Sequence, residues 1–286
     1  MILRILTIIL GLSGLISPLF AQENNALTVM SWNIRLDTQS DSDNQWTFRK
    51  EAFCDEVMHQ YPDVLGVQEA LPQQMKDMRK RFHGYKSLGV ARDDGRKSGE
   101  FSALFFKKDV LKPIRSGTFW LSETPDLPGS RGWDAACNRI VTWAIFKHKP
   151  SGNKFIALNT HFDHMGEVAR VESAQLIIRK IAELGKNLPV VLTGDFNVNS
   201  KHRAYRILTF PENEVVLFDS RMRAKQKSGP DVTYISFDPK FDSPELIDFI
   251  FVNDSFEVIE NEILDFRTKE KYLSDHLPVI VDLKFK

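Results

Sequence analysis

Cysteine is scarce in this sequence of 286 residues, which contains only Cys54 and Cys137. No Cys/His spacing matches a structural zinc site, so that class of small metal-stabilised fold is excluded. A chain of this length can bury a large core and does not need a disulfide for stability. We therefore expect two free, buried thiols, although a secreted chain could pair them.

Net charge is also absent, because 38 Lys and Arg residues balance 38 Asp and Glu residues. Proteins that bind long nucleic acids tightly usually carry a basic surplus, since phosphate neutralisation supplies much of the affinity. We therefore expect no strong nucleic-acid affinity, and the composition mildly favours a compact substrate. The content of 42% hydrophobic and 27% charged residues is typical of a globular protein with a sizeable core.

Long apolar runs are missing as well. The apolar stretch at residues 5–15 follows Arg4 and precedes Leu19-Phe20-Ala21, a pattern typical of a secretory signal peptide. It is shorter than the roughly 20 residues that a membrane span requires. We predict that residues 1–21 are a signal peptide, that the protein is secreted or periplasmic without a transmembrane span, and that residues 22–286 form one monomeric domain.

Apolar periodicity predicts strands and helices in both halves of the chain. Strands are expected at residues 27–32, 64–68, 85–91, 101–107, 140–147, 154–160, 189–192, 246–252 and 277–285, and helices at 47–60, 72–82 and 168–184. Residues 117–138 contain Trp120 and Trp133 and predict a long, ordered loop. Because no linker interrupts this pattern, we predict an α/β domain with two sheets packed face to face and helices outside.

Polar residues follow several of these apolar runs. They are Asn33, Glu69, the pair Asp195 and Asn197, Asp248, and the pair Asp275 and His276. Each one alone is more often a turn or solvated residue. Carboxylate and amide oxygens are the ligands that Mg²⁺ prefers, and an imidazole beside a carboxylate is an acid–base pair. Together these residues indicate a divalent-metal phosphoester hydrolase.

Six segments carry this pattern in order: Trp32-Asn33, Gln68-Glu69, Asn159-Thr160-His161, Gly194-Asp195-Phe196-Asn197, Ile247-Asp248-Phe249-Ile250 and Ser274-Asp275-His276-Leu277-Pro278-Val279. The set resembles the endonuclease/exonuclease/phosphatase superfamily over nearly the whole mature chain. The long loop at residues 117–138 is more similar to an exported bacterial branch of it. The resemblance implies a four-layered α/β sandwich with two mainly antiparallel sheets and the site at one edge.

The resemblance also implies roles for these residues. Asn33 and Glu69 resemble metal ligands for Mg²⁺, which Mn²⁺ could replace, with Asp275 as a direct or water-mediated ligand. His276 resembles the catalytic imidazole, held by Asp248. The pair Asp195 and Asn197 resembles the residues that orient the attacking water, and His161 resembles a phosphate-binding residue. Either Asp195 or His276 would accept the proton of the water.

Substrate class is open at this stage. The segment at residues 133–140 is similar to one in inositol polyphosphate 5-phosphatases, which implies substrate-binding roles for Trp133, Arg139 and His164. Asn159-Thr160-His161 also resembles deadenylase-type exonucleases and bacterial sphingomyelinases. The phosphoester substrate is thus a small molecule, a lipid headgroup, RNA or DNA. The rival hypothesis is a non-catalytic binding protein on the same scaffold.

Overall fold

The computed structural model describes residues 24–286 except 186, 239, 243–244 and 269–270. The predicted signal peptide, residues 1–21, lies outside these described residues. No helix within them is long and apolar enough to cross a membrane.

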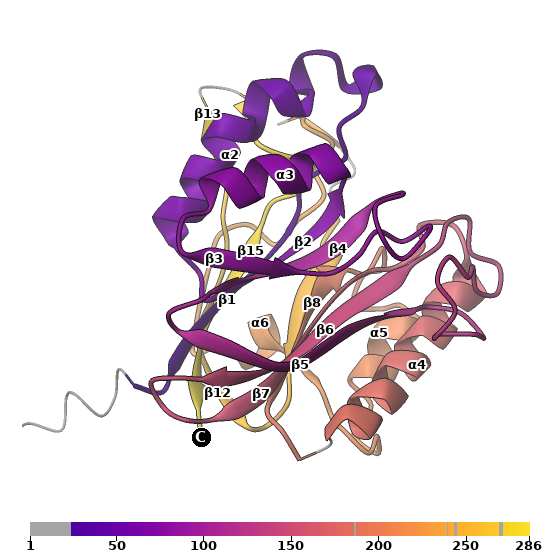
Figure 1. Ribbon diagram of the computed structural model, residues 1–286, viewed down its shortest axis with the longest axis vertical. Helices are drawn as coiled ribbons and strands as arrows, with labels where there is room; N and C mark the ends of the chain where they lie inside the picture. Colours follow the sequence, from indigo (N-terminus) through magenta and orange to yellow (C-terminus); the bar gives the residue numbers. More distant parts are fainter. Residues whose placement is uncertain (1–23, 186, 239, 243–244, 269–270) are drawn as a thin grey trace, which may run out of the picture.

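Two sheets packed face to face form the centre of the molecule (Figure 1). The seven-stranded sheet has the order β10 (Gln226–Ser228), β12 (Phe256–Ile263), β15 (Val279–Phe285), β1 (Ala26–Asn33), β2 (Val64–Ala70), β4 (Phe101–Lys107) and β3 (Tyr85–Leu88). The six-stranded sheet has the order β5 (Leu111–Trp120), β6 (Ile140–His148), β7 (Lys154–His161), β8 (Val190–Asp195), β11 (Asp248–Val252) and β9 (Phe218–Asp219). Most neighbouring strands are antiparallel, and β1–β2, β10–β12 and β7–β8 are parallel. The predicted fold class is confirmed.

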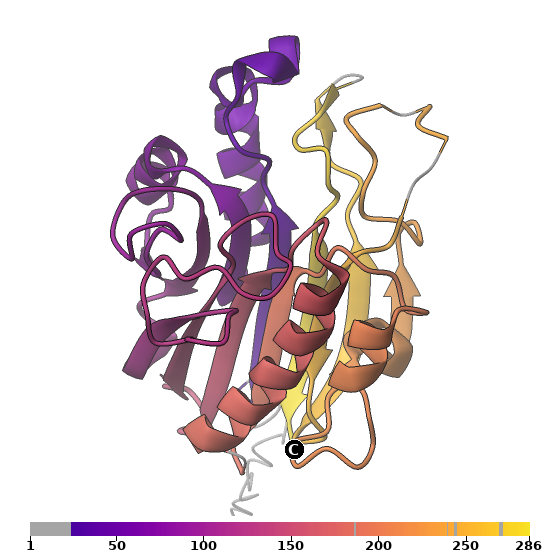
Figure 2. The ribbon, with the colours of Figure 1, turned by 90° about the vertical axis from the view of Figure 1, so that its right-hand side faces the viewer.

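Helices cover the outer face of each sheet. They are the 3-10 helix η1 (Gln39–Asn44) and the α-helices α2 (Trp46–Gln60), α3 (Pro72–Arg81), α4 (Glu167–Gly185), α5 (Arg203–Leu208) and α6 (Ser220–Arg223). A small extra sheet pairs β13 (Arg267–Thr268) with β14 (Lys271–Tyr272). Figures 1 and 2 show α2 and α3 over the seven-stranded sheet and α4 and α5 over the six-stranded one.

Three apolar clusters bind the four layers together. Phe106, Phe146 and Phe155 belong to the cluster between the sheets. Phe53 of α2 packs in a second cluster on the seven-stranded sheet, and Ile177 of α4 packs in a third on the six-stranded sheet. Helix α4 presents buried residues at helical spacing, which is the period that the sequence predicted.

The structure corrects the sequence prediction of the fold in several places. Residues 117–120, predicted as loop, end strand β5, where Phe119 and Trp120 are buried and pair with β6. Strand β12 was not predicted, because a bulge between Val258 and Glu260 interrupts its alternation and the polar Asn261 takes a buried position. Both cysteines are free, as predicted, but only Cys54 is buried and Cys137 is partly exposed.

A polar network joins the two sheets directly beneath the edge that carries the predicted site. Asn159 of β7 donates from Nδ2 to the carbonyl oxygen of Val67 on β2 (2.8 Å). Its Oδ1 accepts from Gln68 Nε2 (2.6 Å) and from Thr193 Oγ1 (2.9 Å). A Cβ at Gly66 would lie 2.3 Å from Thr193 Oγ1, so glycine is required for the sheets to approach this closely.

Candidate active site

Strand register brings the predicted site residues to one edge of both sheets. In the six-stranded sheet, Asp195 at the end of β8 lies between its Cα partners His161 on β7 and Asp248 on β11. In the seven-stranded sheet, β1 and β2 run parallel and present Asn33 and Glu69 at the same end. The segment at residues 274–276 precedes β15, which runs antiparallel to β1 and so begins at this edge.

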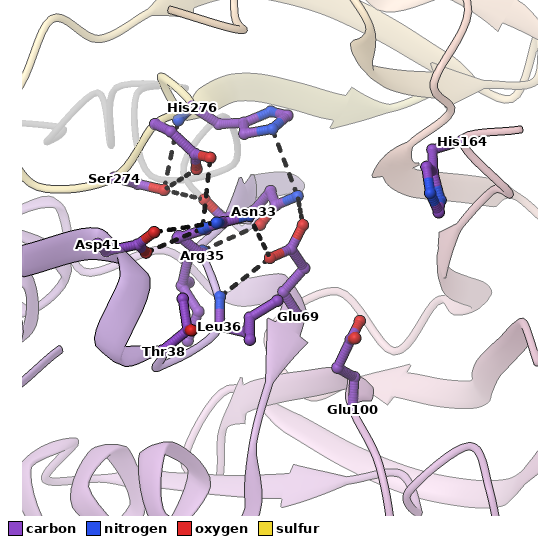
Figure 3. Close-up of polar contacts among 12 residues, drawn as sticks. Asn33, Arg35, Leu36, Thr38, Asp41, Glu69, Glu100, His164, Ser274 and His276 are labelled. Carbon is purple, nitrogen blue, oxygen red and sulfur yellow. Dashed lines mark hydrogen bonds and ion pairs between the residues drawn. The ribbon is translucent and has the colours of Figure 1, made fainter. Parts of the chain in front are cut away.

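Four buried side chains, Asn33, Asp195, Asp248 and His276, form what we call the floor. Asn33 Nδ2 donates to Asp195 Oδ2 (2.9 Å) and to Glu69 Oε1 (3.0 Å). His276 Nδ1 lies 2.8 Å from Asp248 Oδ2, and its Nε2 lies 3.8 Å from Asp195 Oδ2. Figure 3 shows Asn33 between Glu69 and His276. The floor therefore joins residues that are up to 243 positions apart in the chain.

Backbone strain is concentrated around the floor. Arg35, Glu69 and Asn197 have φ values of 57°, 63° and 49°, in the left-handed region that side chains other than glycine rarely adopt. At Glu69 this conformation coincides with a shift in register between β2 and β4. Such a bulge redirects a side chain, and here the carboxylate lines the cleft. Strain of about 1–3 kcal/mol at each position is typical of functional sites.

The buried groups of the floor change one another's protonation. Burial, followed by the negative charge of Asp248, raises the pKa of Asp195 to about 7. Burial disfavours a charged imidazole at His276, but the carboxylates of Asp248 and Asp195 outweigh this effect and raise its pKa well above the usual value. A carboxyl group that titrates near neutrality beside a cationic imidazole is suited to proton transfer.

A second acidic group, Glu69 with Asp275, lies beside the floor and lines the cleft. Arg35 lies between these carboxylates, with Nη1 3.9 Å from Glu69 Oε2 and Nε 3.7 Å from Asp275 Oδ2. Burial tends to raise the pKa of Glu69, but hydrogen bonds from Asn33 and the Leu36 amide outweigh it and lower the pKa. Two carboxylates at the mouth of a cleft fit the oxygen-donor set of a hard divalent cation.

Asn33 was also predicted to bind the metal. Its Oδ1 accepts a hydrogen bond from the backbone N–H of Arg35 (3.0 Å), while its Nδ2 faces the carboxylates of Glu69 and Asp195. In this arrangement the amide positions the carboxylates. A direct metal contact from Asn33 stays a prediction.

The floor offers an alternative metal site, because ligand atoms of Asp195, Asp248 and His276 all lie within 4.8 Å of one another. The contact between His276 and Asp248 already occupies one atom of each residue. All three residues are buried, whereas Mg²⁺ usually keeps several waters. The more accessible carboxylates of Glu69 and Asp275 are therefore the better candidates.

Above the floor is a cleft of about 500 Å³. Its lining contains the carboxylates Glu69, Glu100, Asp195, Glu245 and Asp275, the guanidinium groups Arg35, Arg92 and Arg139, and the imidazoles His161, His164 and His276. Acidic and basic groups are thus mixed throughout the cleft. This lining offers both hydrogen-bond donors and hydrogen-bond acceptors to a ligand.

Predicted phosphate-binding residues lie on one side of the cleft. Asn197 Nδ2 lies 3.0 Å from His161 Nε2, and burial lowers the pKa of His161 well below its usual value. Arg139 precedes β6, with Nε 3.4 Å from Asp163 Oδ2 and Nη2 3.0 Å from His164 Nδ1. The structure thus brings Arg139 and His164 into the cleft, as predicted, and places them against each other.

Trp133 does not line the cleft. Its ring packs against the apolar cluster between α4 and the six-stranded sheet, and its backbone N–H donates to Glu123. Its φ of 49° places it in a strained part of the loop. The structure therefore gives Trp133 a packing position away from the other predicted substrate-binding residues.

Several residues of the site were missed by sequence reasoning. Arg35, Arg92 and Glu100 line the cleft, and Arg49 lies behind the floor. Arg35 is two residues beyond Asn33, and Glu100 directly precedes a predicted strand, so their positions beside strand ends were available signals. Nothing in the helical pattern around Arg49 indicates its role.

Comparison with known proteins gives a consistent result. A model of the endonuclease/exonuclease/phosphatase family matches residues 30–276. The crystal structure of an endonuclease/exonuclease/phosphatase from Bacteroides vulgatus is 43% identical, with a TM-score of 0.88, and the match covers 91% of this chain and 99% of that one. A Bacteroides thetaiotaomicron mannosyl-6-phosphatase structure is 41% identical, with a TM-score of 0.85, over 91% of this chain and 100% of that one.

Tyrosyl-DNA phosphodiesterase 2 of Danio rerio is more distant, with 24% identity over 179 residues. That match covers 62% of this chain and only 42% of the relative, so the chain spans less than half the length of that protein. The family model spans both sheets, from β1 to His276 just before β15. The chain therefore belongs to the endonuclease/exonuclease/phosphatase family, whose members are phosphoester hydrolases.

Proposed function

We propose that this protein is an exported, divalent-metal-dependent phosphatase that hydrolyses phosphomonoesters of small hydroxylated molecules, with sugar phosphates as the first candidates. The main support is the floor, where Asn33, Asp195, Asp248 and His276 form one buried hydrogen-bonded group beneath the cleft. The 41% identity to a mannosyl-6-phosphatase favours a sugar phosphate. The signal-like pattern at residues 1–21 is the basis for export.

Glu69 and Asp275 would hold Mg²⁺, or Mn²⁺ in its place, with Asn33 positioning Glu69 or contributing its own oxygen. When bound, such a cation stabilises the negative charge that grows on the phosphoryl and leaving oxygens. Arg35, between the two carboxylates, keeps part of their charge balanced.

The residues of the floor would then act on the water and the phosphate. Asp195, with its pKa of about 7, accepts a proton from water as the water oxygen bonds to phosphorus and the ester bond to the leaving oxygen breaks. The cationic His276, fixed by Asp248, stabilises the phosphoryl oxygens. His161, Asn197 and Arg139 hold the remaining phosphoryl oxygens.

Phosphodiester hydrolysis is a second candidate, favoured by the sequence match to tyrosyl-DNA phosphodiesterase 2. The lining of the cleft opposes a long polyanion, because five carboxylates are set against three guanidinium groups. A basic surplus, which would add affinity for a nucleic-acid backbone, is also absent from the chain as a whole.

The test is a substrate panel with the purified mature protein. It contains hexose 6-phosphates, an aryl phosphomonoester, an aryl phosphodiester, inositol polyphosphates, sphingomyelin, single-stranded RNA and plasmid DNA, each with EDTA, Mg²⁺ or Mn²⁺. We expect the highest kcat/KM on a hexose 6-phosphate, with loss in EDTA and in His276→Ala. A higher rate on a diester would support the second candidate. Activity that survives in His276→Ala or EDTA would refute the proposed site.

A further inference from the structure

A charged pair on the seven-stranded sheet side of the cleft has no part in the chemistry described so far. Arg92 and Glu100 flank the connection between β3 and β4, and the Arg92 backbone N–H donates to the carbonyl oxygen of Glu100 (3.0 Å). Phe101, the next residue, is the Cα partner of Ala70 at the end of β2. Glu100 is thereby held beside the strand end that carries Glu69.

The two side chains form an ion pair inside the cleft. Arg92 Nη1 donates to Glu100 Oε2 at 2.7 Å, and the side chains are only 15% and 14% exposed. The indole N–H of Trp120 donates to the carbonyl oxygen of Arg92 (2.6 Å), which fixes the backbone of Arg92. Glu100 and His164 line the same cleft as Glu69 and His276, and Figure 3 shows Glu100 and His164 without contacts to the other residues drawn.

The pair retains unused hydrogen-bonding capacity. Arg92 Nε is buried, has no hydrogen-bond partner among the described residues and lies 3.9 Å from Asp93 Oδ1. Only one oxygen of Glu100 accepts from Arg92, although an ionised carboxylate can accept several hydrogen bonds. A purely structural ion pair of this burial would be expected to have its remaining polar atoms satisfied. Both residues line the cleft, so the second oxygen of Glu100 and the outer nitrogens of Arg92 are the groups that could meet a ligand.

We propose that Arg92 and Glu100 form a subsite that binds the hydroxyl groups of the leaving group. This subsite selects phosphomonoesters whose leaving group is uncharged and polyhydroxylated. A hydroxyl group can donate to the Glu100 carboxylate and accept from the Arg92 guanidinium, so adjacent hydroxyls of a sugar match the pair. A second phosphate at this position would be repelled by Glu100, which already lies close to Glu69. The inference rests on the proposed phosphatase function.

The raised pKa of Glu100 supports the placement of this carboxyl group inside the cleft. Burial raises the pKa of Glu100, against the opposing effect of the positive charge of Arg92, and the nearby negative charge of Glu69 adds to the increase. The carboxyl group of Glu100 is therefore already largely desolvated. Hydrogen bonds to a ligand are stronger there than at an exposed surface.

The experiment compares Glu100→Gln and Arg92→Met with wild type on three substrates: mannose 6-phosphate, phenyl phosphate and fructose 1,6-bisphosphate. Arg96→Met, an exposed residue of the same connection, is the matched control. Because a hydrogen bond to a charged group contributes enough to change affinity about tenfold or more, each variant should lose at least that in kcat/KM for mannose 6-phosphate. Phenyl phosphate, which has no hydroxyl groups, should change less than about threefold.

Fructose 1,6-bisphosphate gives a signature that a structural role would not produce. Its kcat/KM relative to mannose 6-phosphate should rise in Glu100→Gln, which removes a negative charge, and fall in Arg92→Met, which removes a positive one. Equal losses on all three substrates in a variant, or no loss on mannose 6-phosphate, would overturn the subsite. A wild-type protein inactive on every phosphomonoester would overturn the proposed function itself, and the subsite with it.

Discussion

The floor and the opposite side of the cleft are built differently. The floor consists of Asn33, Asp195, Asp248 and His276, which lie at or beside strand ends and bond to one another. We call the opposite side the wall, formed by Arg92, Glu100, Arg139 and His164, which lie in or beside connections. Regular strands fix groups to within a fraction of an ångström, whereas connections vary more easily. Under the proposed function, we expect from this difference that the floor carries the reaction chemistry and the wall binds the substrate.

Burial separates the two regions as well. Each residue of the floor is at most 5% exposed, and its charges act on one another with little screening by water. Residues of the wall pair mainly as a cation with a carboxylate or an imidazole, as in Arg92 with Glu100 and Arg139 with His164. Substitutions in the floor should therefore affect kcat on every substrate, and those in the wall should mainly affect KM.

The largest effect is expected from Asp195→Asn. Removing the proton acceptor should lower kcat about 100-fold or more on every phosphoester that the protein hydrolyses. The matched control is Asp219→Asn, another buried carboxyl group, which bonds to Tyr205 and the Arg221 amide. Steady-state kinetics on two unrelated substrates checks the result. A loss confined to one substrate would show that Asp195 selects among substrates. It would contradict the contrast drawn between the floor and the wall.

Arg49→Met tests what supports the floor. Arg49 is 4% exposed and donates to the carbonyl oxygens of Ile34, Arg35 and Leu273, so it ties the segment after Asn33 to the segment before Asp275. Loss of such a supporting residue typically weakens metal binding about 10- to 100-fold. Mn²⁺ titration followed by calorimetry measures this. Arg79→Met, which removes an exposed arginine bonded to Ser87, is the control.

Circular dichroism must accompany the Arg49 experiment, since several buried carbonyl groups lose their donor. A folded variant with unchanged Mn²⁺ affinity would show that the two segments hold the carboxylates without help from Arg49.

Arg139→Lys tests the wall. Lysine keeps the charge but lacks the planar fork that contacts both His164 and Asp163. We expect KM for a phosphomonoester to rise about tenfold, with a smaller change in kcat, because charge-assisted hydrogen bonds of that kind contribute about 1.5–3 kcal/mol. Arg131→Lys, on the exposed part of the same loop, is the control. A fall in kcat with KM unchanged would assign Arg139 to the floor instead.

The smallest effect is expected at His148, which belongs to neither region. Burial lowers the pKa of this imidazole, which contacts Ser151 through Nδ1. The folded protein therefore binds the proton less readily than the unfolded chain. Stability should be lost as pH falls below about 6.5, the ordinary pKa of histidine, towards the lower folded value.

His148→Gln should reduce that loss while leaving kcat and KM unchanged. Thermal unfolding of both proteins between neutral and mildly acidic pH measures it. If the variant is as sensitive to acid as wild type, other groups account for the pH dependence.

The same contrast explains how much could be predicted from the sequence. An apolar run followed by Asn33, Glu69 or Asp195 is a local pattern, and the end of a strand is also where side chains of neighbouring strands meet. The two sheets and the floor were therefore predictable. Strand β12 was not, because a bulge between Val258 and Glu260 interrupts its alternation and the polar Asn261 takes a buried position.

The wall and the supporting residues depend on contacts that no local pattern contains. Residues 92–100 are polar and glycine-containing, which is typical of an exposed turn, and the only local signal in them is the position of Glu100 directly before a predicted strand. Arg49 lies within a correctly predicted helix, yet its partner Leu273 is 224 positions away. Trp133 was placed in the cleft by similarity of a short motif, and the structure gives its ring an apolar site instead.

The contacts among Asn159, Gln68 and Thr193 have a consequence for motion. Sheets joined only by apolar side chains can slide past each other by small amounts, because such contacts have little directional preference. Hydrogen bonds weaken steeply when misaligned, so these contacts oppose sliding directly below the floor. We therefore expect adjustment to a ligand to take place in the connections above, while the groups contributed by the two sheets keep a constant separation.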